Sequence, residues 1–201
     1  MKRRNAVLTA ALALLVALVA FGTAAYFSGE AHVTNVITTG KIDITLKEQT
    51  KDAAGNPIKW PSEGITGVMP GKSVDKLVSV ESVAGSSDAW VRVKVESTIT
   101  AADGKTDLPT KDMLDFDFKP GWIPGAGGYY YYSVPLSAGQ TTPELFTKVT
   151  FAPGMPNEYQ GCTVNVKVTA QAVQKKNNDA KGSITELTAE NYAQIEGWPA
   201  E

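Results

Sequence analysis

Two long stretches of this chain alternate strictly between apolar and polar residues, and that alternation is the strongest constraint on its fold. Residues 89–96 place Ala89, Val91, Val93 and Val95 on one side and Trp90, Arg92, Lys94 and Glu96 on the other. Residues 164–172 repeat the pattern, with Val164, Val166, Val168, Ala170 and Ala172 on one side. A period of two is typical of β-strands with one buried face, and such strands build antiparallel sheets.

The rest of the sequence predicts shorter strands separated by turns that contain Gly, Pro, Asn and Asp. We expect them at residues 41–47, 73–83, 112–119, 129–134 and 145–151, with a loop at 49–64 that includes a short strand at 58–60. About eight strands at this spacing predict an all-β fold, a jelly-roll-like antiparallel β-sandwich. A short C-terminal helix is predicted at residues 189–196, where Thr188 can cap the start and Gly197 can end it.

The N-terminus has the pattern of a secretory signal peptide. A basic cluster at residues 2–4 precedes an uncharged run at residues 6–25, which predicts a signal-peptide helix. Small residues place the signal-peptidase cleavage site between Ala25 and Tyr26. Because the run is also long enough to span a bilayer, an uncleaved membrane anchor is the alternative. Both interpretations place the remaining chain outside the cytoplasm, and cleavage predicts a secreted protein.

Charge and cysteine content exclude further classes. Removal of residues 1–25 reduces the basic residues from 19 to 16 against 21 acidic ones, so the formal charge becomes −5 (16 minus 21). A mildly acidic chain with scattered charges does not predict nucleic-acid binding. Cys162 is the single cysteine, so an internal disulfide cannot form. We interpret Cys162 as a small residue at the start of a strand, with a reactive thiol or an intermolecular bridge as the alternative.

The chain lacks the residues of common catalytic sites, and we expect no enzymatic activity, cofactor or metal. His32 is the only histidine, whereas a zinc peptidase needs closely spaced imidazoles and a general base. A histidine-dependent nucleophile is equally hard to assemble. Asp115 and Asp117 share one face of a predicted strand, which favours a solvated face over acid–base chemistry. Residues 103–107 contain a DG turn, which favours a hairpin over a calcium loop.

Aromatic residues provide an alternative function. Trp60, Trp90 and Trp122 fall at positions that suggest exposure, and residues 129–132 are Tyr129, Tyr130, Tyr131 and Tyr132. In a strand two of these tyrosines would point inward and two outward. Trp122 with the four tyrosines could therefore form a surface-binding platform, for example for carbohydrate. The competing interpretation is that these rings belong to the core or to an interface.

The segment directly after the predicted cleavage site also has strand alternation. Its apolar positions include Phe27, Ala31, Val33 and Ile37, and polar residues lie between them. After cleavage this segment would be a free N-terminus, which is able to leave its own domain. We therefore divide the chain into a signal peptide (1–25), an N-terminal strand segment that is a candidate donor strand (26–40) and a β-sandwich domain (41–201).

Several short blocks resemble the TasA/camelysin (CalY-like) family of Gram-positive bacteria. The first two are GTAAYFS at residues 22–28 and TGKIDI at residues 39–44. The later blocks are MPG at 69–71, GYYYY at 128–132 with Leu136 and Gly139, and YQG at 159–161 leading to VTAQAVQ at 168–174. Together these blocks span nearly the whole chain after the signal segment.

The resemblance implies a secreted jelly-roll subunit of biofilm-matrix or fimbria-like filaments. It implies export through a SipW-type signal peptidase, contact with the membrane only before cleavage, and donor-strand complementation, in which the N-terminal strand of one subunit completes the sheet of the next. Self-association and accessory matrix proteins are the implied partners. Some members carry a metalloprotease label, and we keep that activity as a third alternative because this sequence lacks the histidines for it.

Overall fold

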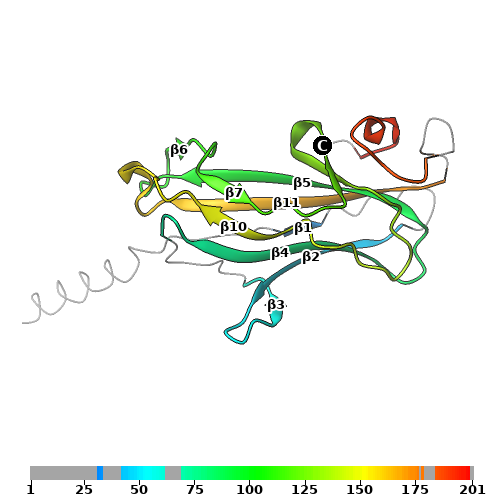
Figure 1. Ribbon diagram of the computed structural model, residues 1–201, viewed down its shortest axis with the longest axis horizontal. Coiled ribbons are helices and arrows are strands. Elements are labelled where there is room, and N and C mark those ends of the chain that lie inside the picture. Colours follow the sequence, from blue (N-terminus) through cyan, green and yellow to red (C-terminus); the bar gives the residue numbers. More distant parts are fainter. Residues whose placement is uncertain (1–30, 34–41, 62–68, 177, 179–183, 200–201) are drawn as a thin grey trace, which may run out of the picture.

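The computed structural model describes residues 31–33, 42–61, 69–176, 178 and 184–199, with backbone only for residues 31–33 (Figure 1). Its strands are β1 (Ala31–Val33), β2 (Ile44–Lys51), β3 (Pro57–Lys59), β4 (Ser73–Ser82), β5 (Ala89–Thr100), β6 (Asp107–Leu108), β7 (Leu114–Phe116), β8 (Trp122–Pro124), β9 (Tyr129–Tyr132), β10 (Phe146–Phe151) and β11 (Thr163–Gln174). Three short 3₁₀ turns, η1 (Ala126–Gly128), η2 (Asn157–Tyr159) and η3 (Tyr192–Gln194), are the helical elements of the described part. The predicted all-β class is confirmed.

The strands form two sheets that pack as a sandwich. The first sheet, which we call the β11 sheet, has the order β1-β11-β5-β9-β8, and β6 also pairs with β5. The second, which we call the β4 sheet, has the order β3-β2-β4-β10-β7. The longest ladder joins β5 and β11 over twelve antiparallel residue pairs. The two stretches with the clearest alternation are therefore the two central neighbours of one sheet.

The main core lies between the two sheets. Val91, Val93, Val166 and Val168 enter it from β5 and β11, and each is fully buried. The opposing β4 sheet contributes buried residues that include Val78 and Val80 from β4 and Phe146 and Val149 from β10. The alternation predicted for β5 and β11 thus identifies their buried face correctly. The jelly-roll connectivity remains a prediction.

A second, smaller core lies on the outer face of the β11 sheet. Trp90, Tyr129, Tyr131 and Val173 contribute to it from three neighbouring strands. The C-terminal segment, residues 184–199, covers them with Leu187 and Ile195, and Figure 1 shows this segment (red) at the end of the sandwich near the 125–128 loop. Gly125 approaches so closely that a Cβ there would lie 2.6 Å from the Tyr131 ring. The C-terminal segment is therefore part of the packed domain.

The helix predicted at residues 189–196 is wrong. A 3₁₀ turn, η3 (Tyr192–Gln194), takes its place. The Asn191 side chain accepts a hydrogen bond from the Thr188 amide at 2.7 Å, and the Thr188 hydroxyl accepts one from the Glu190 amide at 3.3 Å. These local bonds close a turn in place of a first helical turn, since Asn and Thr side chains compete with the helix for backbone groups. The turn directs Ile195 onto the sheet.

The loop predicted at residues 49–64 is partly wrong. β2 continues to Lys51, and β3 (Pro57–Lys59) pairs with it in an antiparallel hairpin. Asp52 closes the connection by accepting hydrogen bonds from the amides of Ala54 and Asn56 at 2.9 and 2.8 Å. In Figure 1 this hairpin projects from the body of the sandwich.

Three predicted features fall outside the described residues. They are the signal segment, the Ala25/Tyr26 cleavage site, and positions Phe27 and Ile37 of the strand-exchange face. Within the residues that the structure describes, no helix is long and apolar enough to cross a membrane.

Candidate functional site

The candidate site is the edge of the β11 sheet at which the N-terminal strand lies. β1 pairs with β11 in parallel, and the paired residues are Ala31 with Val168, His32 with Thr169, and Val33 with Ala170. Val168 and Ala170 are fully buried and face the main core. Ala31 and Val33, two of the four predicted strand-exchange positions, therefore occupy register positions on the core side of the sheet.

This edge of β11 has capacity beyond β1. The Lys175 amide donates to the Asp88 carbonyl at 2.9 Å and continues the β5–β11 ladder. Odd-numbered residues of β11 therefore direct their main-chain groups to β5, and even-numbered residues direct theirs to the β1 side. β11 has twelve residues, whereas only residues 168–170 pair with the described residues of β1. A longer strand could add hydrogen bonds along the same edge.

The other side of the site is the inner face of β2. β1 lies beside β2 as well as β11, so it closes the gap between the two sheets. Ile44, Leu46 and Glu48 alternate on the buried face of β2. Two of these are ordinary core residues, and Glu48 is a carboxylate at a core position.

Glu48 forms a buried ion pair with Lys76 of β4. The Glu48 Oε1 and Lys76 Nζ atoms lie 2.8 Å apart, and the two side chains are 4% and 0% exposed. Beyond this contact, neither atom has a hydrogen-bond partner in the described part of the chain. The Trp60 ring lies 4.0 Å from Nζ, a cation–π distance. Desolvation by burial lowers the pKa of Lys76, although the Glu48 charge opposes this effect.

The predicted aromatic platform does not agree with the burial of its rings. Trp122, Tyr129 and Tyr131 are buried, and Tyr130 and Tyr132 are half-buried against the main core. The expected exposure of Trp60 and Trp90 is also wrong, since both are buried. The alternation predicted for the four tyrosines is correct, because Tyr129 and Tyr131 face the second core. Their outward faces are covered by the C-terminal segment, which period-two alternation cannot reveal.

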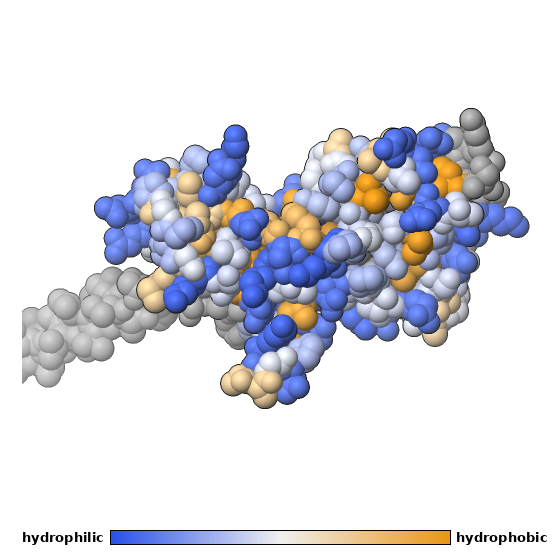
Figure 2. Space-filling model, viewed as in Figure 1, coloured by the Kyte–Doolittle hydropathy of each residue, from blue (hydrophilic) through white to orange (hydrophobic). Residues whose placement is uncertain are grey.

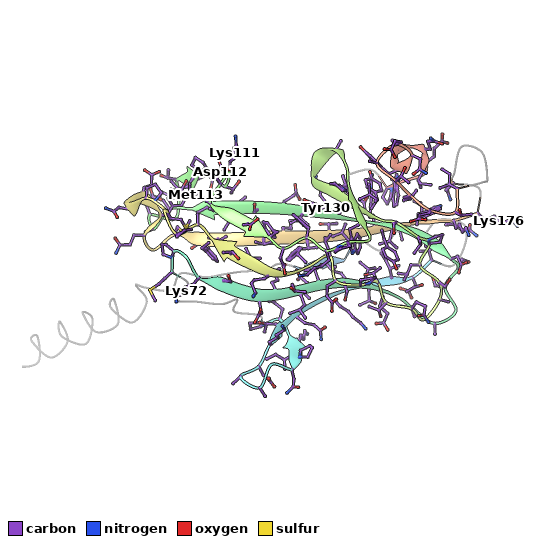
Figure 3. The ribbon with its side chains drawn as sticks, in the orientation of Figure 1. Lys72, Lys111, Asp112, Met113, Tyr130 and Lys176 are labelled. Atoms are coloured by element: carbon purple, nitrogen blue, oxygen red, sulfur yellow. The ribbon has the colours of Figure 1, made fainter. Side chains whose placement is uncertain are left out.

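One aromatic stack does reach the surface. Phe118 is 38% exposed, and its ring stacks on Tyr130 with 4.1 Å between centroids. Figure 2 shows apolar side chains in the hollow between the β6 end and the C-terminal end of the molecule, and Figure 3 places Tyr130 near the middle, by β5. A flat sugar-binding surface would need several coplanar exposed rings, and Phe118 is the one exposed aromatic of the described chain.

Arg92 has a partner set that sequence reasoning missed. Its guanidinium lies between two rings, 3.9 Å from the Tyr129 centroid and 4.5 Å from that of Trp198. Its Nε donates to Gln171 Oε1 at 2.8 Å. Arg92 therefore connects the β11 sheet to the C-terminal segment, and its position in the outward phase of β5 was the available signal.

The acidic residues have structural roles in turns. Asp117 accepts hydrogen bonds from the Thr147 and Lys148 amides, both at 2.7 Å, and from Lys119 Nζ at 2.6 Å. Desolvation raises the pKa of Asp117, but the hydrogen bonds from Lys119, Thr147 and Lys148 outweigh it and lower the pKa to about 2. Asp103 accepts from the Lys105 and Thr106 amides, which agrees with the predicted hairpin turn.

No metal-binding group is present in the described residues, where no three His, Cys, Asp or Glu side chains gather. Of the residues with potential chemistry, His32 lies in β1, and Cys162 is half-buried just before β11, as predicted. Burial raises the pKa of the Cys162 thiol, which disfavours the reactive thiolate. No protein-family model matches this sequence, and comparisons with curated proteins and with solved structures found no match.

Proposed function

We propose that this chain is a secreted structural subunit that assembles into extracellular biofilm-matrix or fimbria-like filaments. Assembly proceeds by exchange of the N-terminal strand after signal-peptide cleavage. The observation that carries the proposal is the position of β1, a short parallel strand at the edge of β11 that comes from the N-terminal end of the chain.

The small extent of the β1 contact supports exchange. β1 makes three residue pairs with β11, whereas β5 makes twelve with the same strand. Edge strands with few pairs open at low free-energy cost compared with the centre of a sheet. When β1 leaves, the core-facing side of β11 and the inner face of β2 lose their cover. An equivalent strand from a second copy restores the same contacts.

Exchange of this kind produces a fibre. The donor strand and the acceptor edge are different surfaces of one chain, so the contact between copies is heterologous and repeats without closing. Insertion of Phe27, Val33 and Ile37 would bury three large apolar side chains, each worth about 1.5–3 kcal/mol. Before cleavage, the donor segment is joined to the signal helix. A SipW-type signal peptidase would therefore release the donor, and accessory matrix proteins could end or begin the filament.

Electron microscopy and sedimentation of two purified chains test the proposal. The chain that begins at Tyr26 should form filaments, and the chain that begins at Lys41 should stay monomeric because it lacks the donor. Near-ultraviolet circular dichroism checks that both keep the packed core. If the chain from Tyr26 remains monomeric at every concentration at which it is soluble, the proposed function is wrong.

A further inference from the structure

We propose that residues 26–33 of one copy dock in parallel along residues 163–170 of the next, and that Glu30 beside Lys167 fixes the register. This inference rests on the proposed function and names the residues that specify its contact. It extends the pairing of β1 with β11 to the upstream residues of the donor segment.

The register of β1 determines where the upstream residues would lie. Each paired residue of β11 is 137 positions after its β1 partner, as for Ala31 and Val168 (168 minus 31). The same offset places Tyr26 opposite Thr163, which is the first residue of β11. The predicted first residue of the cleaved chain and the start of the acceptor strand therefore coincide, and this match defines the length of the docked segment.

The offset also matches the apolar pattern. Phe27 and Gly29 fall opposite Val164 and Val166, which are buried in the main core, and Ala31 and Val33 follow opposite Val168 and Ala170. The even-numbered residues of β11 direct their amides and carbonyls toward this edge, as the Lys175–Asp88 hydrogen bond establishes. The docked segment would thus add main-chain hydrogen bonds and core contacts together.

Apolar alternation cannot fix the register by itself. A slip of one residue would place polar side chains toward the core, but a slip of two residues keeps every side chain on its face. A charge pair on the outer face can exclude the two-residue slip. With the proposed offset Glu30 lies opposite Lys167, whereas the slipped registers place Ser28 or His32 there.

The charges around Lys167 favour an incoming carboxylate. Lys167 is exposed and lies opposite Glu96 of β5, and Glu96 is paired with Lys94 at 3.3 Å. Lys167 itself makes no ion pair with a described residue. These three side chains carry a net charge of +1, so Glu30 would neutralise the group. Lys167 is thus a register determinant on the acceptor strand.

Disulfide trapping tests the register directly. Glu30→Cys and Lys167→Cys are placed in separate chains that begin at Tyr26 and carry Cys162→Ala, and the two chains are mixed and oxidised. Directly opposed strand residues are about 4.8 Å apart, within disulfide range, whereas a shift of two residues brings them to about 7–8 Å. We expect the mixed disulfide, and we expect Ser28→Cys or His32→Cys with Lys167→Cys to give several-fold less of it.

Charge reversal supplies an independent measurement. Glu30→Lys and Lys167→Glu should each raise the critical concentration for filaments by about two- to fivefold, and the double reversal should restore it. Lys148→Glu, an exposed lysine on β10, is the matched control and should change little. Filaments that link better through position 28 or 32, or a double reversal that does not recover, would overturn the register and leave the proposed function intact. Absence of filaments from the unmodified chain would overturn the proposed function itself.

Discussion

Ala31 of β1 lies directly opposite Val168 of β11, and the two strands run in parallel. Every other strand pairing in the described part of the chain is antiparallel. Parallel neighbours need a crossover connection, and here the two strands come from opposite ends of the sequence. The N-terminal strand is therefore joined to the sheet by pairing alone, and replacement by the same strand of another copy requires no change in the rest of the fold.

The second core predicts that the C-terminal segment contributes to global stability. Leu187 is 1% exposed and packs on the outer face of the β11 sheet. Leu187→Ala should lower the free energy of unfolding by about 2–4 kcal/mol, measured by urea denaturation. Glu186→Ala, at an exposed neighbouring position, is the control and should change it by less than about 0.5 kcal/mol. Equal stability of the two variants would mean that the segment is not part of the packed domain.

Trp122 distinguishes a core role from a surface-binding role. The ring is buried, and its Nε1 donates to the Pro143 carbonyl at 3.3 Å. Trp122→Ala should therefore lower the free energy of unfolding by about 3–5 kcal/mol. A glycan pull-down provides the contrasting readout. A variant that keeps the stability of the unmodified chain but loses glycan retention would favour the carbohydrate-binding alternative.

Asp117 predicts an acid-dependent loss of stability. Its pKa is lowered from 3.8 to about 2 in the folded state, so the folded state holds the charged form more strongly than the unfolded state does. The contribution is present above pH 4 and is lost as the pH falls through 2. Since the carboxylate is 34% exposed, we discount it to about 1 kcal/mol. Urea denaturation of Asp117→Asn should show this deficit at pH 6 and almost none at pH 2.

The buried ion pair predicts non-additive substitutions. Lys76→Met alone leaves the Glu48 carboxylate buried without its cation, and this should cost about 3–5 kcal/mol of stability. Adding Glu48→Leu removes the unpaired charge, so the double variant should recover most of the loss. A double variant that is less stable than the single variant would show that the pair stabilises the fold by more than its desolvation cost.

The same pair predicts a dependence on alkaline pH. The folded pKa of Lys76 lies below its ordinary value of 10.5, so the unfolded state binds more protons between the two values. Stability of the unmodified chain relative to the double variant should therefore rise as the pH increases toward 10.5. Urea denaturation of both chains between pH 7 and pH 10.5 measures this, and a difference that falls with pH would contradict the burial of a charged Lys76.

The strands and their buried faces could be predicted from the sequence where alternation is strict. Val91 and Val93 in β5, and Val166 and Val168 in β11, all face the core as their period-two pattern predicts. Alternation reports which face is buried but not which strands pair, so the neighbourhood of β1 and β11 could not be predicted. That neighbourhood depends on contacts between residues more than 130 positions apart in the sequence.

The misses have physical causes that can be named. Lys76 shares the core-facing phase of β4 with Val74 and Val78, a signal that was available, but its burial depends on Glu48 from the neighbouring strand. Tyr131 has the outward phase of β9, and it is buried because residues 184–199 fold over it. The turn at Thr188 and Asn191 replaced the predicted helix through side-chain bonds that propensity does not include.

Electron microscopy of a matched pair of variants tests strand exchange most directly. Val33 lies opposite the buried Ala170 and His32 lies opposite Thr169, so neighbouring residues of one strand occupy opposite faces. In chains that begin at Tyr26, Val33→Asp should abolish filaments because it places a charge against the core, while His32→Ser should form filaments normally. Circular dichroism should show a folded domain in both. Filaments from folded Val33→Asp protein that are as abundant as those of the unmodified chain would contradict assembly through this strand.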